Sequence, residues 1–216
     1  MQFEELSAGE ALKQAMDSVG RSDRVVVCGS PDEVGLLEEF AEDVEQSPQE
    51  ILEAARRIDV AEWFRKREAE IGEDRADVLD EDEWPGWIDT GGLTLTDDVL
   101  TGEPLPSVAV ARLQVRAPWE IPAHFRYGGW NDCPEPEVHC AVWKDWHERY
   151  GAHIVGVSGS IIEAVVERPP MEPEEAMRLA WQQYLYCTDI VDQGAESVAN
   201  LAGGLFLGRT WYFWWD

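Results

Sequence analysis

Five consecutive aromatic residues lie near the end of the sequence, within segment 210–216 (Thr-Trp-Tyr-Phe-Trp-Trp-Asp). Aromatic residues favour the half-buried surface of a β-sheet, and burial of each ring contributes roughly 1.5–3 kcal/mol, so the segment predicts a strand. Because side chains alternate along a strand, one face carries Trp211, Phe213 and Trp215. The opposite face carries Tyr212 and Trp214. Both faces are then largely apolar, which is typical of a central strand covered on both sides.

The acidic excess of the chain restricts the partners that it can bind. Its 44 Asp and Glu residues against 17 Lys and Arg residues give a formal net charge of -27. Such a charge repels phosphate backbones and anionic lipid surfaces, so we expect neither nucleic acid nor a membrane as partner. A basic protein is compatible with it, although solubility alone is a simpler reason for the charge. The acid is concentrated in the first half, where residues 1–106 hold 29 acidic and 9 basic residues.

The composition favours a folded protein of the cytoplasm. With 216 residues, 44% of them hydrophobic, the chain can bury the core of one large domain or two small ones. No apolar run follows a basic start, and no stretch approaches the roughly 18 apolar residues of a membrane span. Four cysteines occur without a CxxC pair and are expected to stay as thiols in a reducing compartment: Cys28, Cys133, Cys140 and Cys187.

The first half predicts an acidic, mostly helical N-terminal region over residues 1–79. A serine followed three residues later by a glutamate is the pattern of a capping box, and it marks helix starts at Ser7, Ser30 and Ser47. Residues 24–28 predict one short buried strand. Residues 80–106 are rich in acid, glycine and proline and predict a linker, which Trp84 and Trp87 attach to a domain face.

The second half, residues 107–216, predicts a C-terminal domain in which strands and helices are mixed. Strands are expected at 108–116, 152–158, 161–168 and 210–215, and helices at 136–150, 173–186 and around 198–205. A two-residue turn in the hairpin would place Val157 opposite Ile162 and Val155 opposite Ala164. We therefore expect an α+β fold, with helices packed on a mainly antiparallel sheet.

Several short motifs of the second half occur in a fixed order. They are Gly128-Gly129-Trp130-Asn131, Trp146-His147-Glu148-Arg149-Tyr150-Gly151-Ala152, Arg168-Pro169-Pro170, Cys187-x-Asp189-Ile190-Val191-Asp192-Gln193-Gly194 and Trp211-x-Phe213-Trp214-Trp215-Asp216. In these motifs the chain resembles the bacterial domain-of-unknown-function family 4253, over about residues 107–216. The resemblance implies no activity, because the family has no assigned function.

The polar residues of these turns are the candidates for a site. Carboxylates can bind hard cations or divide acid and base roles in catalysis. In a turn, they equally satisfy backbone N–H groups. We expect residues 128–132 and 189–194 to lie near each other beside the sheet, where any small-molecule site would be. The candidate residues are Trp130, Asn131, Asp132, Glu163, Asp189, Asp192 and Gln193, with the carboxylate of Asp216 as a further member.

Other chemical patterns are weaker. Cys133, His139, Cys140 and His147 have the atom types of zinc ligands, but neither CxxC nor HExxH spacing. The two histidines are eight residues apart, about 12 Å along a helix, which is too far to share one metal. A nucleophilic Cys187 has no supporting local signature. The turn after residues 25–28 lacks a glycine-rich phosphate motif. We therefore expect no metal and no cofactor.

Together these patterns predict a non-enzymatic, acidic binding or inhibitor-like module for a basic protein partner, steered to it by charge. The alternative is a hydrolase or transferase that uses the carboxylates in the turns around Trp130 and Asp189. Convergence of these carboxylates at the mouth of one pocket would favour the enzyme. The patterns do not predict an oligomeric state.

Overall fold

Serine and aspartate side chains start the helices of the first half. The computed structural model describes residues 2–71, 84–98 and 101–216. The Ser7 hydroxyl accepts a hydrogen bond from the backbone N–H of Glu10. The capping boxes predicted at Ser30 and Ser47 are formed. Asp59 accepts from the N–H of Glu62 at 3.0 Å. The helices that follow these caps are α1 (Ala8–Asp17), α2 (Pro31–Glu42), α3 (Pro48–Ala55) and α4 (Val60–Ile71).

Prolines start the longest helices of the second half, at a position where a missing N–H costs no helical hydrogen bond. α6 (Pro136–Tyr150) and α7 (Pro173–Tyr186) have the bounds expected from the sequence. Gly151 ends α6 in the left-handed conformation that glycine adopts easily. The remaining helices of the described residues are the 3-10 turn η2 (Pro118–Glu120), α5 (Ile121–Phe125), the π-helix η3 (Val191–Ala195) and α8 (Val198–Leu205).

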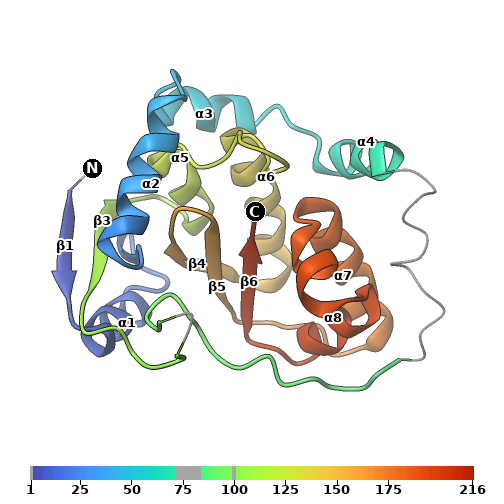
Figure 1. Cartoon of the computed structure of the whole chain (residues 1–216). Helices are drawn as coiled ribbons and strands as arrows, with labels where there is room; N and C mark the ends of the chain where they lie inside the picture. Colours follow the sequence, from blue (N-terminus) through green and yellow to red (C-terminus); the bar gives the residue numbers. More distant parts are fainter. Residues whose placement is uncertain (1, 72–83, 99–100) are drawn as a thin grey trace.

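A six-stranded sheet joins both halves of the chain (Figure 1). The strand order is β1-β3-β2-β4-β5-β6, and neighbours pair antiparallel except β2 and β4, which are parallel. The expected α+β fold with a mainly antiparallel sheet is therefore confirmed. The strands are β1 (Phe3–Leu6), β2 (Asp23–Val27), β3 (Val108–Gln114), β4 (Ala152–Val157), β5 (Ile161–Val166) and β6 (Thr210–Trp214).

The two faces of the sheet are covered by different elements. On one face, α6 and α7 bring Trp143, Trp146 and Tyr186 into ring contact with Phe213 of β6. Figure 1 shows α6 behind the sheet, and α7 with α8 beside β6. On the opposite face, α1 packs with valines of β2 and β3 and with Leu95. Most of the hydrophobic core lies on the α6 side.

The aromatic strand β6 lies at the edge of the sheet, so the prediction of a central strand is wrong. Its inner face is buried as expected, since Trp211, Phe213 and Trp215 are at most 2% exposed. Tyr212 on the outer face is 43% exposed. The outer face of β6, which carries Tyr212 and Trp214, borders a groove and is not covered by a second layer of core. Alternation along the strand cannot distinguish these two environments.

β4 and β5 form the predicted hairpin with one irregularity. Val157 pairs with Ile162, as expected. Ala164 pairs with Ile154 and not with Val155, because the register shifts between Ile154 and the next paired residue. Such a β-bulge adds one residue to one strand, and neither turn chemistry nor alternation reveals it.

The N-terminal region contributes two strands to the sheet, although the sequence predicted one. β1 was missed because Glu4 and Glu5 make up half of it, a composition typical of short charged edge strands. In the predicted linker, the Trp84 ring packs edge-on against the Phe206 ring, with the two ring centroids 5.5 Å apart. Trp87, in contrast, is 58% exposed. The predicted boundary between residues 79 and 80 lies outside the described residues.

Candidate ligand-binding site

The two polar turns of the second half meet at the last residue of the chain, as expected. Asn131 donates from Nδ2 to the carbonyl oxygen of Asp216 at 2.6 Å, and Asp189 accepts from the Asp216 N–H at 3.1 Å. Asp132 accepts from the hydroxyl of Thr188 at 3.4 Å. These polar groups therefore hold the C-terminal residue beside η3.

The carboxylates of these turns already have partners in their own chain. Asp132 forms an ion pair with Arg67 of α4, and Arg67 also donates to the carbonyl oxygen of Leu185. Asp189 accepts a second hydrogen bond, from Gln193 Nε2 at 3.0 Å. Asp192 lies in η3 and is exposed.

Trp130 and Glu163 lie apart from these turns. The Trp130 ring stacks on Phe40 of α2 with centroids 4.3 Å apart and meets Tyr127 edge-on. Glu163 lies on the outer face of β5, where it is 2% exposed. Asn131, Asp132 and Asp189 gather around Thr188 and Asp216, whereas Trp130 and Glu163 lie elsewhere. The seven candidate residues therefore do not converge at one mouth. Asp189 and Gln193 line the groove described next.

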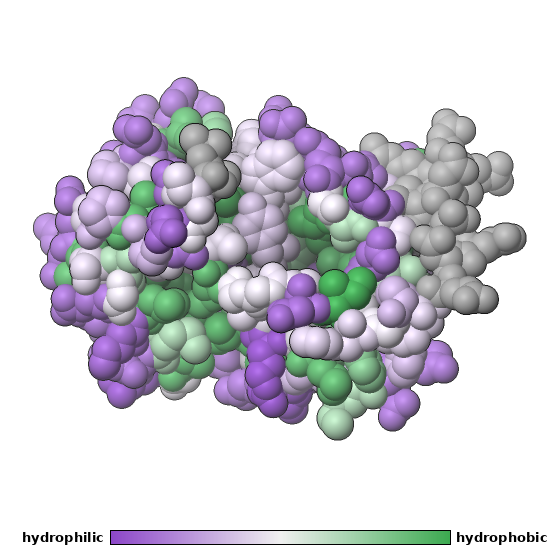
Figure 2. Space-filling view, turned by 60° about the horizontal axis from the view of Figure 1, so that its bottom comes forward, coloured by the Kyte–Doolittle hydropathy of each residue, from purple (hydrophilic) through white to green (hydrophobic). Residues whose placement is uncertain are grey.

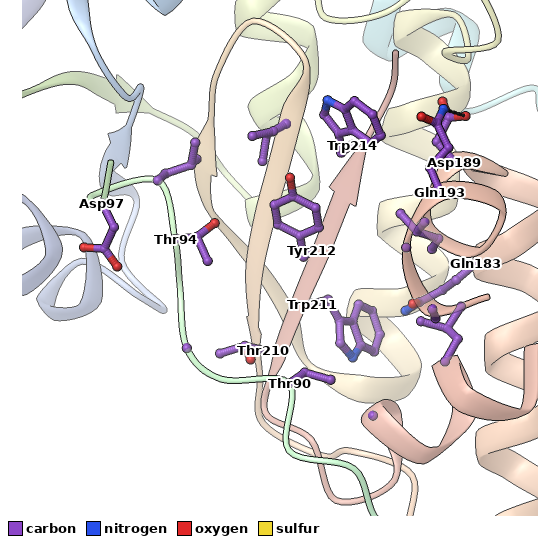
Figure 3. A pocket seen from close by; sticks show the side chains of 18 of the residues that line it. Thr90, Thr94, Asp97, Gln183, Asp189, Gln193, Thr210, Trp211, Tyr212 and Trp214 are labelled. Atoms are coloured by element: carbon purple, nitrogen blue, oxygen red, sulfur yellow. Dashed lines mark hydrogen bonds between the residues drawn. The ribbon is translucent and has the colours of Figure 1, made fainter. Parts of the chain in front are cut away.

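A groove of about 1180 Å³ runs along the outer face of β5 and β6. Tyr212 and Trp214 form its floor, the segment before β3 forms one wall, and α7, η3 and α8 form the other (Figure 3). Ile161, which pairs with Trp214 in the sheet, also lines the groove. Figure 2 shows a face of the molecule on which hydrophobic residues gather in several patches, with hydrophilic residues between and around them. The volume is that of a site for an organic ligand or a short stretch of peptide.

The first wall is held to the sheet by Glu163. We call residues 86–98 the strap. The Glu163 carboxylate accepts from Thr94 N at 2.6 Å, from Thr94 Oγ1 at 2.7 Å and from Leu95 N at 3.2 Å. Burial raises the pKa of Glu163, and these hydrogen bonds act in the opposite direction. Glu163 therefore has a structural role in shaping the groove.

Two glycines of α8 allow the strap to approach the helix closely. Ile88 donates from its backbone to the carbonyl oxygen of Gly203 at 3.0 Å. A Cβ at Gly203 would lie 2.8 Å from the carbonyl oxygen of Gly86, and one at Gly204 would lie 2.5 Å from Thr90 Cγ2. Both distances are shorter than real Cβ contacts, so larger residues here would displace the strap.

The groove is acidic at its rim and uncharged at its floor. The described lining residues include no lysine, arginine or histidine. In the described part of the chain, Glu33, Asp97, Asp189 and Glu196 take part in no ion pair. Burial raises the pKa of Tyr212 to about 12, so its phenol is neutral at pH 7. The acidic lining residues are Glu33, Asp97, Asp98, Asp189 and Glu196.

The residues considered as zinc ligands are not gathered in one place. The Cys133 thiol lies 3.4 Å from His139 Nε2, and His139 Nδ1 is hydrogen-bonded to the hydroxyl of Tyr186. Cys140 packs against residues of α3 and α5. The His147 ring contacts the His153 ring edge-on. The described residues contain no group of three His, Cys, Asp or Glu residues arranged to hold a metal ion.

The thiol of Cys187 and the turn after β2 both make hydrogen bonds within the chain. Cys187 donates from its thiol to the carbonyl oxygen of Trp214 at 3.0 Å, and burial raises the pKa of that thiol. It is therefore protonated and unsuited to nucleophilic attack. At the start of α2, the Glu33 carboxylate accepts from the Ser30 N–H at 2.5 Å, in the place where a helix would bind a phosphate.

The sequence pattern does not predict the groove, because the composition of the strap is that of a linker. Alternation along the strand does place Tyr212 and Trp214 on the face opposite the core, and this is a sequence signal for the floor of the groove.

None of the helices in the described residues is both long and apolar enough to span a membrane.

Comparison with known proteins identifies one family. A family model described as "Domain of unknown function (DUF4253)" matches residues 109–216. No curated protein and no solved structure matches the chain. The matched range includes the floor of the groove and the wall made by α7, η3 and α8, whereas the strap precedes it.

Proposed function

This chain belongs to the DUF4253 family, whose model covers half of it and brings no activity, and from its groove we propose a non-enzymatic acidic module that binds a segment of a basic protein. One observation carries the proposal. The groove combines an aromatic floor with five acidic lining residues and no basic one among those described. A lysine or arginine side chain has the matching chemistry, with an apolar stem and a cationic end.

The floor and the rim would contact different parts of such a side chain. The rings of Tyr212 and Trp214 can pack against an aliphatic stem and attract a cation over their faces. Asp97 and Glu196, on opposite walls, can pair with the charged end. Because the acidic groups line a concave surface with an apolar floor, their negative electrostatic potential is concentrated in the groove.

The net charge of the whole chain supports the same choice of partner. At -27, the protein attracts cationic partners over distances near the Debye length, about 8 Å at physiological ionic strength. This attraction raises association rates more than it raises affinity. An inhibitor-like role towards a basic protein is compatible with that behaviour.

The alternative of a hydrolase or transferase would use Asp132 and Asp189. These carboxylates are engaged by Arg67, Gln193 and the backbone of Asp216, which keep the C-terminal residue in place. A general acid or base needs a carboxyl group that can reach a substrate. The arrangement therefore favours binding over catalysis.

Binding of a short peptide tests the proposal. The probe is acetyl-Leu-Lys-Leu-Lys-Leu-amide with a fluorophore, measured by anisotropy against the whole chain. The double variant Asp97→Asn/Glu196→Gln should weaken binding about three- to tenfold, because each lost ion pair contributes a fraction of a kcal/mol to about 1 kcal/mol. Raising the salt concentration to 1 M should weaken it further.

The control has the same change in charge at two exposed positions outside the groove, Glu53→Gln/Glu174→Gln. It should leave the affinity for the peptide close to that of the natural sequence. Equal losses in both double variants would contradict the groove as the binding site. So would equally tight binding of acetyl-Leu-Glu-Leu-Glu-Leu-amide.

A further inference from the structure

Two residues that line the groove carry a buried N–H group with no acceptor. Gln183 of α7 is 1% exposed and Trp211 of β6 is 2% exposed, and both line the cavity. In the described residues, neither Gln183 Nε2 nor Trp211 Nε1 has a hydrogen-bond partner. Other buried polar atoms also lack partners, such as Trp146 Nε1 and Trp215 Nε1, but their residues do not line the groove.

The two side chains lie next to each other at one end of the groove. In Figure 3, Gln183 extends from α7 towards Trp211, and its amide ends beside the indole. Both lie below the level of Gln193 and Asp189 in this view, near the end of the groove where Thr90 and Thr210 lie. The arrangement places two donors beyond the aromatic floor that Tyr212 and Trp214 form.

The chemistry of the missing partner follows from these donors. The indole of tryptophan can only donate, and the unpartnered atom of Gln183 is its amide nitrogen, so the partner is a hydrogen-bond acceptor. A buried donor without an acceptor is unfavourable, and a ligand that supplies one relieves this cost on binding. An acceptor oxygen within the ligand is therefore expected at this place.

The charge of the groove decides which acceptor is suitable. A carboxylate would be repelled by the acidic residues along the rim and would find no lysine, arginine or histidine among the described lining residues. A neutral carbonyl oxygen avoids this repulsion and accepts two hydrogen bonds with its two lone pairs. The amide carbonyl of a peptide bond is such a group.

We infer that Gln183 and Trp211 form a subsite for a backbone carbonyl oxygen of a bound peptide segment, whose lysine or arginine side chain lies at the acidic rim. This inference rests on the proposed function and names the group that the groove recognises besides the cation. Two donors on rigid elements, α7 and β6, would fix the orientation of the peptide. The acidic rim would select its charge.

The indole signals of the whole protein provide the first test. Spectra of the ¹⁵N-labelled natural protein are recorded during titration with acetyl-Leu-Lys-Leu-Lys-Leu-amide. The Nε1–H resonance of Trp211, assigned through its own backbone, should move downfield on binding, because it gains an acceptor. The resonance of Trp215 should not, because that side chain does not line the groove.

Substitutions provide the second test. Trp211→Phe and Gln183→Leu remove one donor each and should each weaken peptide binding about three- to tenfold, which is the effect of losing one neutral hydrogen bond. The control is Trp215→Phe, which removes an equally buried and unpartnered indole N–H outside the groove. It should bind the peptide as the natural protein does.

The outcomes separate this inference from the proposed function. If Trp211 shows no downfield shift, or Trp211→Phe binds no more weakly than Trp215→Phe, the carbonyl subsite is wrong. The proposed function then still stands, provided that Asp97→Asn/Glu196→Gln weakens binding. If the natural protein does not bind the peptide at all, both are overturned. Should a substituted protein fail to fold, the shift in the natural protein decides.

Discussion

Acid should destabilise this protein through one buried histidine. His139 is fully buried, with Nδ1 hydrogen-bonded to the Tyr186 hydroxyl and Nε2 next to the Cys133 thiol. The rings of Tyr127 and Trp215 meet it edge-on. Burial lowers the pKa of His139 to about 3, because an imidazolium would lose its hydration there, and a hydrogen bond with the Pro134 backbone offsets only part of this loss.

The magnitude follows from the two pKa values. The unfolded chain has a histidine pKa of about 6.5, so it binds more protons than the folded protein as the pH falls below 6.5. The contribution of neutral His139 is therefore fully present above that pH and is lost as the pH falls towards 3. Between pH 7 and pH 5.5, the loss in unfolding free energy is about 1 kcal/mol. Most carboxylates stay ionised over this interval.

Urea unfolding at the two pH values, for the natural protein and for His139→Gln, measures this contribution. The other three histidines are present in both proteins, so the difference between the two pH effects isolates His139. Titration of the ring protons of His139 in the natural protein gives its pKa directly. An equal pH effect in both proteins, or a His139 that titrates near pH 6.5, would refute the reasoning.

Two further substitutions test the groove wall and the aromatic core. Glu163→Gln replaces a carboxylate oxygen by an amide nitrogen, so one N–H group of the strap loses its acceptor. The free energy of unfolding should therefore fall by about 1–3 kcal/mol. The amide proton of Leu95 should also exchange faster with solvent. An unchanged exchange rate would contradict this anchoring. Phe213→Ala should cost about 3–5 kcal/mol in urea unfolding, because it empties a fully buried site against Trp146. Tyr212→Ala, at a 43% exposed position, should cost less than about 1 kcal/mol, and a similar loss for both would argue against the assigned faces.

Local signals in the sequence predicted local structure well. α6 and α7 have the expected bounds because prolines start both helices and Gly151 ends the first. The pairing of Val157 with Ile162 followed from a two-residue turn. These features depend on residues a few positions apart, which a single sequence contains.

Features that depend on distant segments were missed or wrong. The edge position of β6 depends on strand order, because β6 pairs with β5 alone among the described strands. The exposure of its outer face depends on the strap, a segment whose composition predicts a linker. The sequence makes Asp132 and Glu163 candidates for chemistry, but in the structure they bind Arg67 and the strap, which are distant in sequence. The prediction that the two polar turns meet succeeded because both adjoin helices packed on the same sheet.

The single parallel pairing of the sheet has a consequence for the order of events during synthesis. β2 pairs with β4 through Val27 and Gly156, and β3 lies on the other side of β2. At typical translation rates, β4 follows β2 out of the ribosome after ~6–25 s. During that time, the three consecutive valines of β2 have an open edge, a condition that favours aggregation or capture by a chaperone. The pairing of β2 with β4 can form only late in synthesis, although β2 lies in the interior of the finished sheet between β3 and β4.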